Sequence, residues 1–258
     1  MSYIVAGSEP FFLPGGVTGC LLLHGFSAMP EEMRPMGEYL AQKGFTVLGL
    51  RLAGHATHPN DLKHTHWTDW LDDVEDGLAL LSKMCANRVL IGQSLGGMIA
   101  LIAAARYDVS GVVGLSTPYD ISTSERLVYV LRRLLQPTIH KPVKRFPPDH
   151  PLYSRRELNY PAYPEVPSRI LTELNRLATA MVAALPQVRV PALLIHSRED
   201  HAVLFTCMQS IYDHLGSSKK EMFPLEGMDH SLVQDPKQQM VFEAVEKFLT
   251  EIVNKSWE

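Results

Sequence analysis

Ser94 stands in a setting typical of a catalytic nucleophile. An apolar run, Val89–Ile91, precedes it, a helix-forming stretch of small and apolar residues follows it, and Gly92 and Gly96 lie two places away on either side. A strand that reverses directly into a helix forces its corner residue to positive φ, and neighbours two positions away must then be very small. Chance alone produces such a five-residue pattern in roughly one chain of this length in thirteen, so the pattern by itself is weak. The strand before it and the helix after it are what the turn requires. The sequence therefore predicts a serine hydroxyl presented on a sharp turn.

A nucleophilic serine needs a base, and the base needs a carboxylate that fixes its tautomer. In the fold built on this turn the order is serine, acid, histidine, with the last two in loops that follow later strands. Asp200 follows the predicted strand at 191–197, and His230 follows the predicted strand at 220–224. Glu199 and Asp229 are the competing acids: the side chain adjacent to His230 should point away from it, and alternation lets only one of Glu199 and Asp200 face His230. Chain order and loop placement predict Ser94, Asp200 and His230 as a triad; the alternative is that His230 only caps its loop.

Hydrolysis through a serine also needs two backbone donors for the developing oxyanion. One is expected at the N–H of Leu95, directly after the nucleophile, and the other at Phe26, in the loop after the apolar run at 20–23. His24, in the same loop, is expected to hydrogen-bond the loop itself rather than a substrate.

The elements that must position these groups alternate regularly. Strands are expected at 11–13, 20–23, 46–50, 88–93, 109–116, 191–197 and 220–224. Helices are expected at 30–43, 66–85, 168–185, 201–215 and 236–252, and a further helix directly after the turn at Ser94. This alternation predicts an α/β fold with a mostly parallel sheet covered on both faces. We assign residues 1–118 and 186–258 to this core.

Residues 119–185 interrupt the alternation and are predicted to form a cap. Eight of the chain's eighteen prolines lie between Pro137 and Pro167. A capping box at 122–125 precedes a helix whose apolar face is expected to line the acyl pocket; that face comprises Leu127, Val130, Leu131 and Leu134. Residues 119–170 hold nine Lys and Arg against five Asp and Glu, a net of +4. This charge either forms an ordinary solvated face or attracts an amphipathic or anionic substrate.

These motifs resemble those of the α/β-hydrolase superfamily, and within it the bacterial carboxylesterases and monoacylglycerol lipases. The resemblance rests on residues 24–26, 51–55, 92–97 and 199–201 and on the late His230, and covers roughly 18–116 and 186–252. It implies the α/β-hydrolase fold, the triad and oxyanion donors named above, and ester hydrolysis without metal or cofactor. It also implies Asp200 rather than Glu199 as the acid, with Glu199 facing solvent or Arg198. The chain departs from it at Val203–Phe205, where relatives often carry proline, and in a cap richer in proline and arginine.

Composition excludes several other classes of protein. The net charge of −4 argues against a nucleic-acid surface, and no run of 18 apolar residues predicts an integral membrane segment. The N-terminus lacks the pattern of a signal peptide, and Cys20, Cys85 and Cys207 are expected to be reduced thiols in a cytoplasmic protein. A histidine-rich loop contains metal-ligand residue types without the spacing of a zinc site, so no metal is expected there; these residues are His55, His58, Asp61, His64, His66 and Asp69.

The predicted function is hydrolysis of a small-molecule ester with a short to medium acyl chain, or of a monoacylglycerol, through an acyl-enzyme. A hydrolase of another bond with the same triad stays open, acting on feruloyl-type aromatic esters, thioesters, amides or carbon–carbon bonds. A non-catalytic binding protein of this fold would normally lack a triad residue, and none is missing here.

Overall fold

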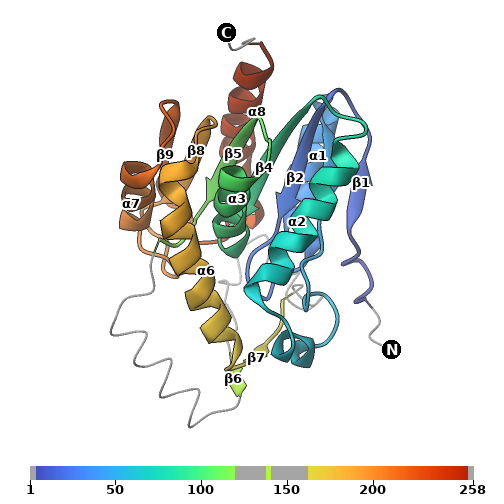
Figure 1. The fold of residues 1–258 in the computed structure, drawn as a ribbon, viewed down its shortest axis with the longest axis vertical. Coiled ribbons are helices and arrows are strands. Elements are labelled where there is room, and N and C mark those ends of the chain that lie inside the picture. Colours follow the sequence, from blue (N-terminus) through green and yellow to red (C-terminus); the bar gives the residue numbers. More distant parts are fainter. Residues whose placement is uncertain (1–3, 120–137, 141–161, 255–258) are drawn as a thin grey trace.

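The fold is built on one seven-stranded sheet. The computed structural model describes residues 4–119, 138–140 and 162–254 (Figure 1). The strands are β1 (Phe11–Leu13), β2 (Thr18–Leu23), β3 (Thr46–Gly49), β4 (Asn87–Gln93), β5 (Gly111–Leu115), β6 (Thr138–His140), β7 (Glu165–Pro167), β8 (Ala192–Ser197) and β9 (Lys220–Leu225). The α-helices are α1 (Arg34–Gln42), α2 (Trp67–Leu81), α3 (Leu95–Arg106), α6 (Ile170–Ala184), α7 (Thr206–His214) and α8 (Gln238–Asn254).

The sheet has the order β1-β3-β2-β4-β5-β8-β9, and all its neighbouring strands are parallel except β1 and β3. Phe11 of β1 pairs with Gly49, where any Cβ would overlap the Phe11 ring. Strand order puts β4 at the centre, flanked by β2 and β5. The expected α/β fold with a mostly parallel sheet is confirmed.

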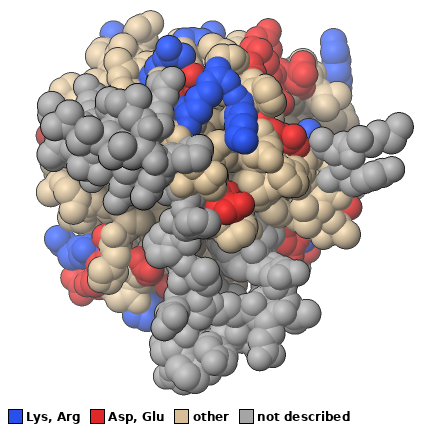
Figure 2. All heavy atoms as spheres, turned by 90° about the horizontal axis from the view of Figure 1, so that it is seen from below, with Lys and Arg blue, Asp and Glu red and all other residues tan. Residues whose placement is uncertain are grey.

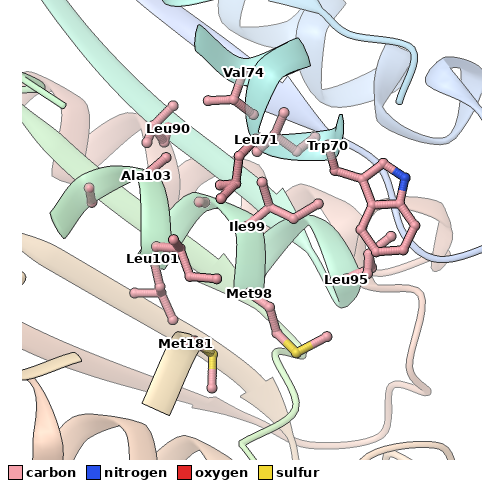
Figure 3. Close-up of a cluster of buried hydrophobic side chains, with 14 of the residues drawn as sticks. Trp70, Leu71, Val74, Leu90, Leu95, Met98, Ile99, Leu101, Ala103 and Met181 are labelled. Carbon is pink, nitrogen blue, oxygen red and sulfur yellow. The ribbon is translucent and has the colours of Figure 1, made fainter. Parts of the chain in front are cut away.

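Helices cover both faces of the sheet, as the unbroken apolar strands require. Along β4, Leu90 joins the core under α2, α3 and α6, whereas Val89 and Ile91 join the core under α1 and α8. Figure 3 shows the first of these cores, in which Met181 of α6 lies beside α3. The nucleophile turn between β4 and α3 is thus held by packing on both faces.

Several local expectations needed correction. The predicted helix at 30–43 is a 3₁₀ turn, Pro30–Met33, followed by α1, and a further 3₁₀ turn, Pro59–Lys63, lies in a stretch expected to be loop. Both turns begin with proline, which fixes φ and supplies no N–H. Helix α7 begins at Thr206 rather than near His201 because the chain first loops around Asp200.

The predicted cap is described in part. β6 and β7 form a two-stranded antiparallel sheet, at the lower end of Figure 1, and α6 packs on α3 and α2 in the main core. Seen from that end, the described charged residues of both signs are interspersed with uncharged ones (Figure 2). The expected pocket residues Leu127, Val130, Leu131 and Leu134 lie outside the described residues. The boundaries of the cap stay a prediction.

Among the described residues, no helix combines the length and apolar character needed to cross a membrane.

Candidate active site

Ser94 occupies a strained turn between β4 and α3. Its φ and ψ are 54° and −111°, and its N–H donates to the carbonyl of Leu115 at 2.8 Å. A Cβ on Gly92 would overlap the carbonyl of Gly96, and a Cβ on Gly96 would overlap the carbonyl of Leu23. The two glycines therefore permit the close backbone approach that the sequence predicted for this turn. The strain holds the serine side chain at the start of α3, and Ser94 remains partly accessible.

A continuous hydrogen-bonded line joins Ser94 to a buried carboxylate. His230 Nε2 lies 2.9 Å from Ser94 Oγ, and His230 Nδ1 lies 2.8 Å from Asp200 Oδ2. Because the carboxylate can only accept, Nδ1 carries the proton, and Nε2 of the neutral ring is left to accept from the serine hydroxyl. The structure thus brings together the three residues predicted as a triad, in the order nucleophile, base, acid.

Asp200 is enclosed by donors. Its Oδ1 accepts the N–H groups of Ala202 and Val203, both at 2.8 Å, and its Oδ2 is shared by His230 and His196. Burial by itself raises the pKa of the Asp200 carboxyl, but the hydrogen bonds from His196 and His230 more than offset this and hold that pKa well below its usual range. The carboxylate therefore stays charged at neutral pH.

The side chains of the competing acids, Glu199 and Asp229, accept hydrogen bonds from other groups. Glu199 was expected to face solvent or Arg198; it is exposed, but its carboxylate accepts from the Gly227 N–H at 2.7 Å and the Ser197 hydroxyl at 3.2 Å. The Gly227 hydrogen bond lowers the pKa of Glu199. Asp229 Oδ1 accepts from the His201 N–H at 3.3 Å. Glu199 thus ties the loop after β8 to the loop after β9.

The loop after β2, where the second oxyanion donor is predicted, is held against the nucleophile turn. The Gly25 N–H donates to Glu32 Oε2 at 2.7 Å, and an added Cβ on Gly25 would lie 3.7 Å from the Gln93 carbonyl. Phe26 is partly buried in this loop, and Leu95 begins α3 on the other side of the contact. The predicted donors therefore lie on two segments in direct contact.

His24 has the structural role expected of it. Its Nε2 accepts from the Leu52 N–H at 3.2 Å, so Nδ1 carries the proton and donates to the Gly25 carbonyl at 2.9 Å. Complete burial lowers the pKa of His24 to about 4. The ring is therefore neutral under ordinary conditions and bridges two loops.

Several residues that support the site carried no signal in the sequence. Gln93 Nε2 donates to the His230 carbonyl at 2.8 Å, and His196 and Glu32 contact the site as described above. Tyr163, just after the undescribed part of the cap, donates to the Gly54 carbonyl at 3.0 Å, while its N–H donates to the Ser27 carbonyl at 2.9 Å. Gln93 and Tyr163 are distant in sequence from the groups they bind, and His196 and Glu32 meet nearby partners only because the chain turns between them.

The histidine-rich loop uses its side chains in local structure. His58 Nδ1 accepts from the Asn60 N–H, His66 precedes α2 as its N-cap, and His55 Nδ1 contacts the Ala53 carbonyl at 3.0 Å. Within the described ranges, no group of three His, Cys, Asp or Glu residues could hold a metal ion.

Sequence comparison finds relatives that span almost the whole chain. A thermostable monoacylglycerol lipase of Bacillus sp. (strain H-257) is 34% identical over 244 residues, covering 93% of both chains. A carboxylesterase of Bacillus subtilis (strain 168) is 26% identical and covers 96% of this chain and 98% of its own.

Structure comparison agrees. A chain from work on LipS and LipT, two metagenome-derived lipolytic enzymes, superposes with a TM-score of 0.88 at 26% identity, covering 96% of this chain and 100% of its own. A monoacylglycerol lipase of Paleococcus ferrophilus shares the fold with a TM-score of 0.79 at 15% identity, covering 95% of this chain and 98% of its own. The family model Hydrolase_4, described as serine aminopeptidase, S33, matches residues 18–237. The chain therefore belongs to this family of α/β hydrolases.

Proposed function

We propose that the protein is a serine hydrolase that cleaves carboxylic esters of short to medium acyl chains, or monoacylglycerols, without a metal or cofactor. The observation that carries this is the line Ser94–His230–Asp200, with hydrogen-bond distances of 2.9 and 2.8 Å. The relatives named as a monoacylglycerol lipase and a carboxylesterase support an ester as the substrate. The three cysteines are free thiols, which fits the cytoplasmic location expected from the sequence.

Each step of the reaction uses a group that the site provides. Ser94 Oγ attacks the carbonyl carbon while its proton moves to His230 Nε2, and Asp200 stabilises the resulting imidazolium. His230 then gives that proton to the departing alcohol as the ester C–O bond breaks, leaving an acyl-enzyme. A water molecule repeats the sequence, losing a proton to His230 and releasing the acid and Ser94.

The tetrahedral intermediates carry an oxyanion, which the N–H groups of Leu95 and Phe26 are proposed to bind. Leu95 stands at the positive end of the α3 dipole, which adds to the stabilisation of a negative charge. One such donor contributes a factor of roughly a hundred or more in kcat.

Labelling with a fluorophosphonate tests the nucleophile. We expect wild type to be labelled at Ser94 and Ser94→Ala to be unlabelled, with hydrolysis of p-nitrophenyl esters reduced by at least roughly a thousandfold and an unchanged circular dichroism spectrum. Retention of more than about a hundredth of the wild-type rate by folded Ser94→Ala would remove Ser94 from this role.

A substrate panel tests the bond type and the acyl preference. It compares p-nitrophenyl esters and monoacylglycerols of increasing chain length with aminoacyl anilides and acyl-CoA. Each methylene that enters an apolar pocket adds about 0.8 kcal/mol of binding until the pocket is full, so kcat/KM should rise and then fall with acyl length. Faster turnover of an anilide or thioester than of every ester would replace the proposed substrate class.

A further inference from the structure

A second histidine reaches the carboxylate of the triad. His196 lies in β8, four residues before Asp200, and its Nε2 is 3.1 Å from Asp200 Oδ2. The two side chains are 1% and 0% exposed, so water does not compete for this contact. The pair is therefore part of the interior rather than a surface ion pair.

The protonation of His196 follows from its neighbours. Its Nε2 also lies 3.2 Å from the carbonyl oxygen of Val203, and both that oxygen and Asp200 Oδ2 can only accept. Nε2 must therefore carry a hydrogen, which is shared between the two acceptors. The ring thus acts as a fixed donor toward Asp200.

This donor completes the coordination of the carboxylate. A carboxylate has about four acceptor positions. Ala202 and Val203 occupy those of Oδ1, and His230 and His196 occupy those of Oδ2. Without His196, Oδ2 of this buried anion would be held by His230 alone, so the orientation of the carboxylate plane would be less tightly fixed.

We propose that His196 is a positioning residue for the triad: its Nε2–H fixes the orientation of the Asp200 carboxylate and shares the negative charge that Oδ2 presents to His230. This inference rests on the proposed function of Ser94, His230 and Asp200.

Among the residues that the structure describes, Asp200 is the one acid recorded in contact with His196. The Phe205 ring packs edge-on against the His196 ring, with 6.0 Å between the ring centroids. The Arg198 guanidinium lies 4.6 Å from the centroid of the Phe205 ring. On the neighbouring strand β9, Pro224 lies opposite His196. Among the described contacts, Asp200 and, through its Oδ2, His230 are the titratable groups that meet His196. A substitution at His196 should therefore change the pH profile of the reaction through Asp200 and His230.

Loss of the His196 donor should move the pH profile in one direction. The acid limb of kcat/KM reports protonation of the free enzyme's base, here His230. Removing a donor from Oδ2 concentrates its negative charge on the remaining hydrogen bond, which favours the positively charged form of the base. The acid limb should then move to higher pH.

The test compares His196→Leu with His196→Gln, whose amide N–H can take the place of Nε2–H. For p-nitrophenyl butyrate we expect His196→Leu to lose roughly tenfold or more in kcat, with KM within about twofold and the acid limb at higher pH. We expect His196→Gln to keep a kcat within about threefold of wild type, with the acid limb of its pH profile at the wild-type position. Leu194→Ala, two residues earlier in the same strand, is the matched control: it removes a buried side chain, so it should lower stability and leave the acid limb in place.

Two results would overturn the proposal: a folded His196→Leu with the kcat and acid limb of wild type, or a His196→Gln as impaired as His196→Leu. If His196→Leu does not fold, nitrogen-15 NMR of the wild type decides, because a His196 Nε2 without a proton at neutral pH contradicts the geometry and a protonated one supports it. If wild type cleaves no ester in the panel, the proposed function fails, while the NMR measurement still tests His196.

Discussion

At the scale of single side chains, the acids near His230 differ in what their oxygens accept. Asp200 receives the Nδ1–H of His230 and is fully buried, whereas Glu199 and Asp229 are exposed and accept backbone N–H groups of neighbouring loops. A charge in a dry site orients the base strongly, while an exposed charge is screened by solvent. Only Asp200 is therefore in a position to hold His230 in the required tautomer.

This difference predicts the effect of neutralising each acid. Asp200→Asn should lose about four orders of magnitude in kcat, because an amide at this position favours the wrong tautomer of His230. Glu199→Gln keeps an acceptor oxygen for the Gly227 N–H, and we expect it and Asp229→Asn to stay within about tenfold of wild type. The measurement is kcat on a p-nitrophenyl ester at neutral pH. A near-normal Asp200→Asn would mean that another carboxylate orients His230.

At the scale of elements, the junction of β4 and α3 depends on two backbones that touch. A Cβ on Gly92 would overlap backbone atoms of Gly96, which cannot move without displacing Ser94. Gly92→Ala should therefore lower the free energy of unfolding by more than about 3 kcal/mol or prevent folding. Gly111→Ala in β5 is the control: its Cβ would overlap the end of the Ile252 side chain, at 2.5 Å, but would lie in ordinary contact with the Pro191 carbonyl and the Phe248 ring, at 3.4 and 3.5 Å. Because the end of a side chain can move, we expect a change within about 1 kcal/mol. Urea unfolding measures both, and equal losses would contradict this account of the turn.

The loop after β2 depends on one buried carboxylate. Glu32 is 4% exposed; it accepts the Gly25 N–H through its side chain, and the Gln234 amide donates to its carbonyl at 2.6 Å. Glu32→Ala frees the segment that carries Phe26, so kcat should fall roughly ten- to a hundredfold with little change in KM. Glu32→Gln keeps an acceptor oxygen and should retain most of the activity. Equal activity of the alanine variant and wild type, by steady-state kinetics, would show that Glu32 does not hold this loop.

The elements were largely predictable because both faces of the parallel strands are buried. Runs such as Val89–Ile91 then consist of apolar residues alone, and helices with one apolar face fill the intervals between them. His196 was not predictable in this way. Its spacing from Asp200 places the two in contact only because residues 198–203 fold back on the end of β8, and that depends on hydrogen bonds specific to this loop. Glu32 was not predictable either, because the N–H that it accepts, that of Gly25, lies seven residues earlier across a turn.

At the scale of the whole molecule, titration of buried groups couples global stability to pH. His24 is fully buried, and its pKa is lowered to about 4 from 6.5 by burial. Asp73, whose Oδ2 accepts the Ala53 N–H at 2.6 Å, has its pKa raised to about 6, also mainly by burial. The two groups change the stability in opposite directions as the pH falls. At His24 the unfolded chain binds a proton more readily than the folded protein, whereas at Asp73 the folded protein binds a proton more readily than the unfolded chain.

A variant without a titratable group at position 24 separates the contribution of His24 to the pH dependence of stability from that of Asp73. Between pH 7 and pH 5 the unfolded chain gains a proton on His24 that the folded protein does not take up, so the folded state loses stability as the pH falls. At about 1.4 kcal/mol per pH unit below 6.5, this loss is about 2 kcal/mol. His24→Gln cannot titrate, while Asp73 is common to both proteins. We therefore expect wild type to lose about 2 kcal/mol more than His24→Gln between pH 7 and pH 5, measured by urea unfolding at both values. Identical losses would mean that His24 is not held neutral between the loop after β2 and Leu52.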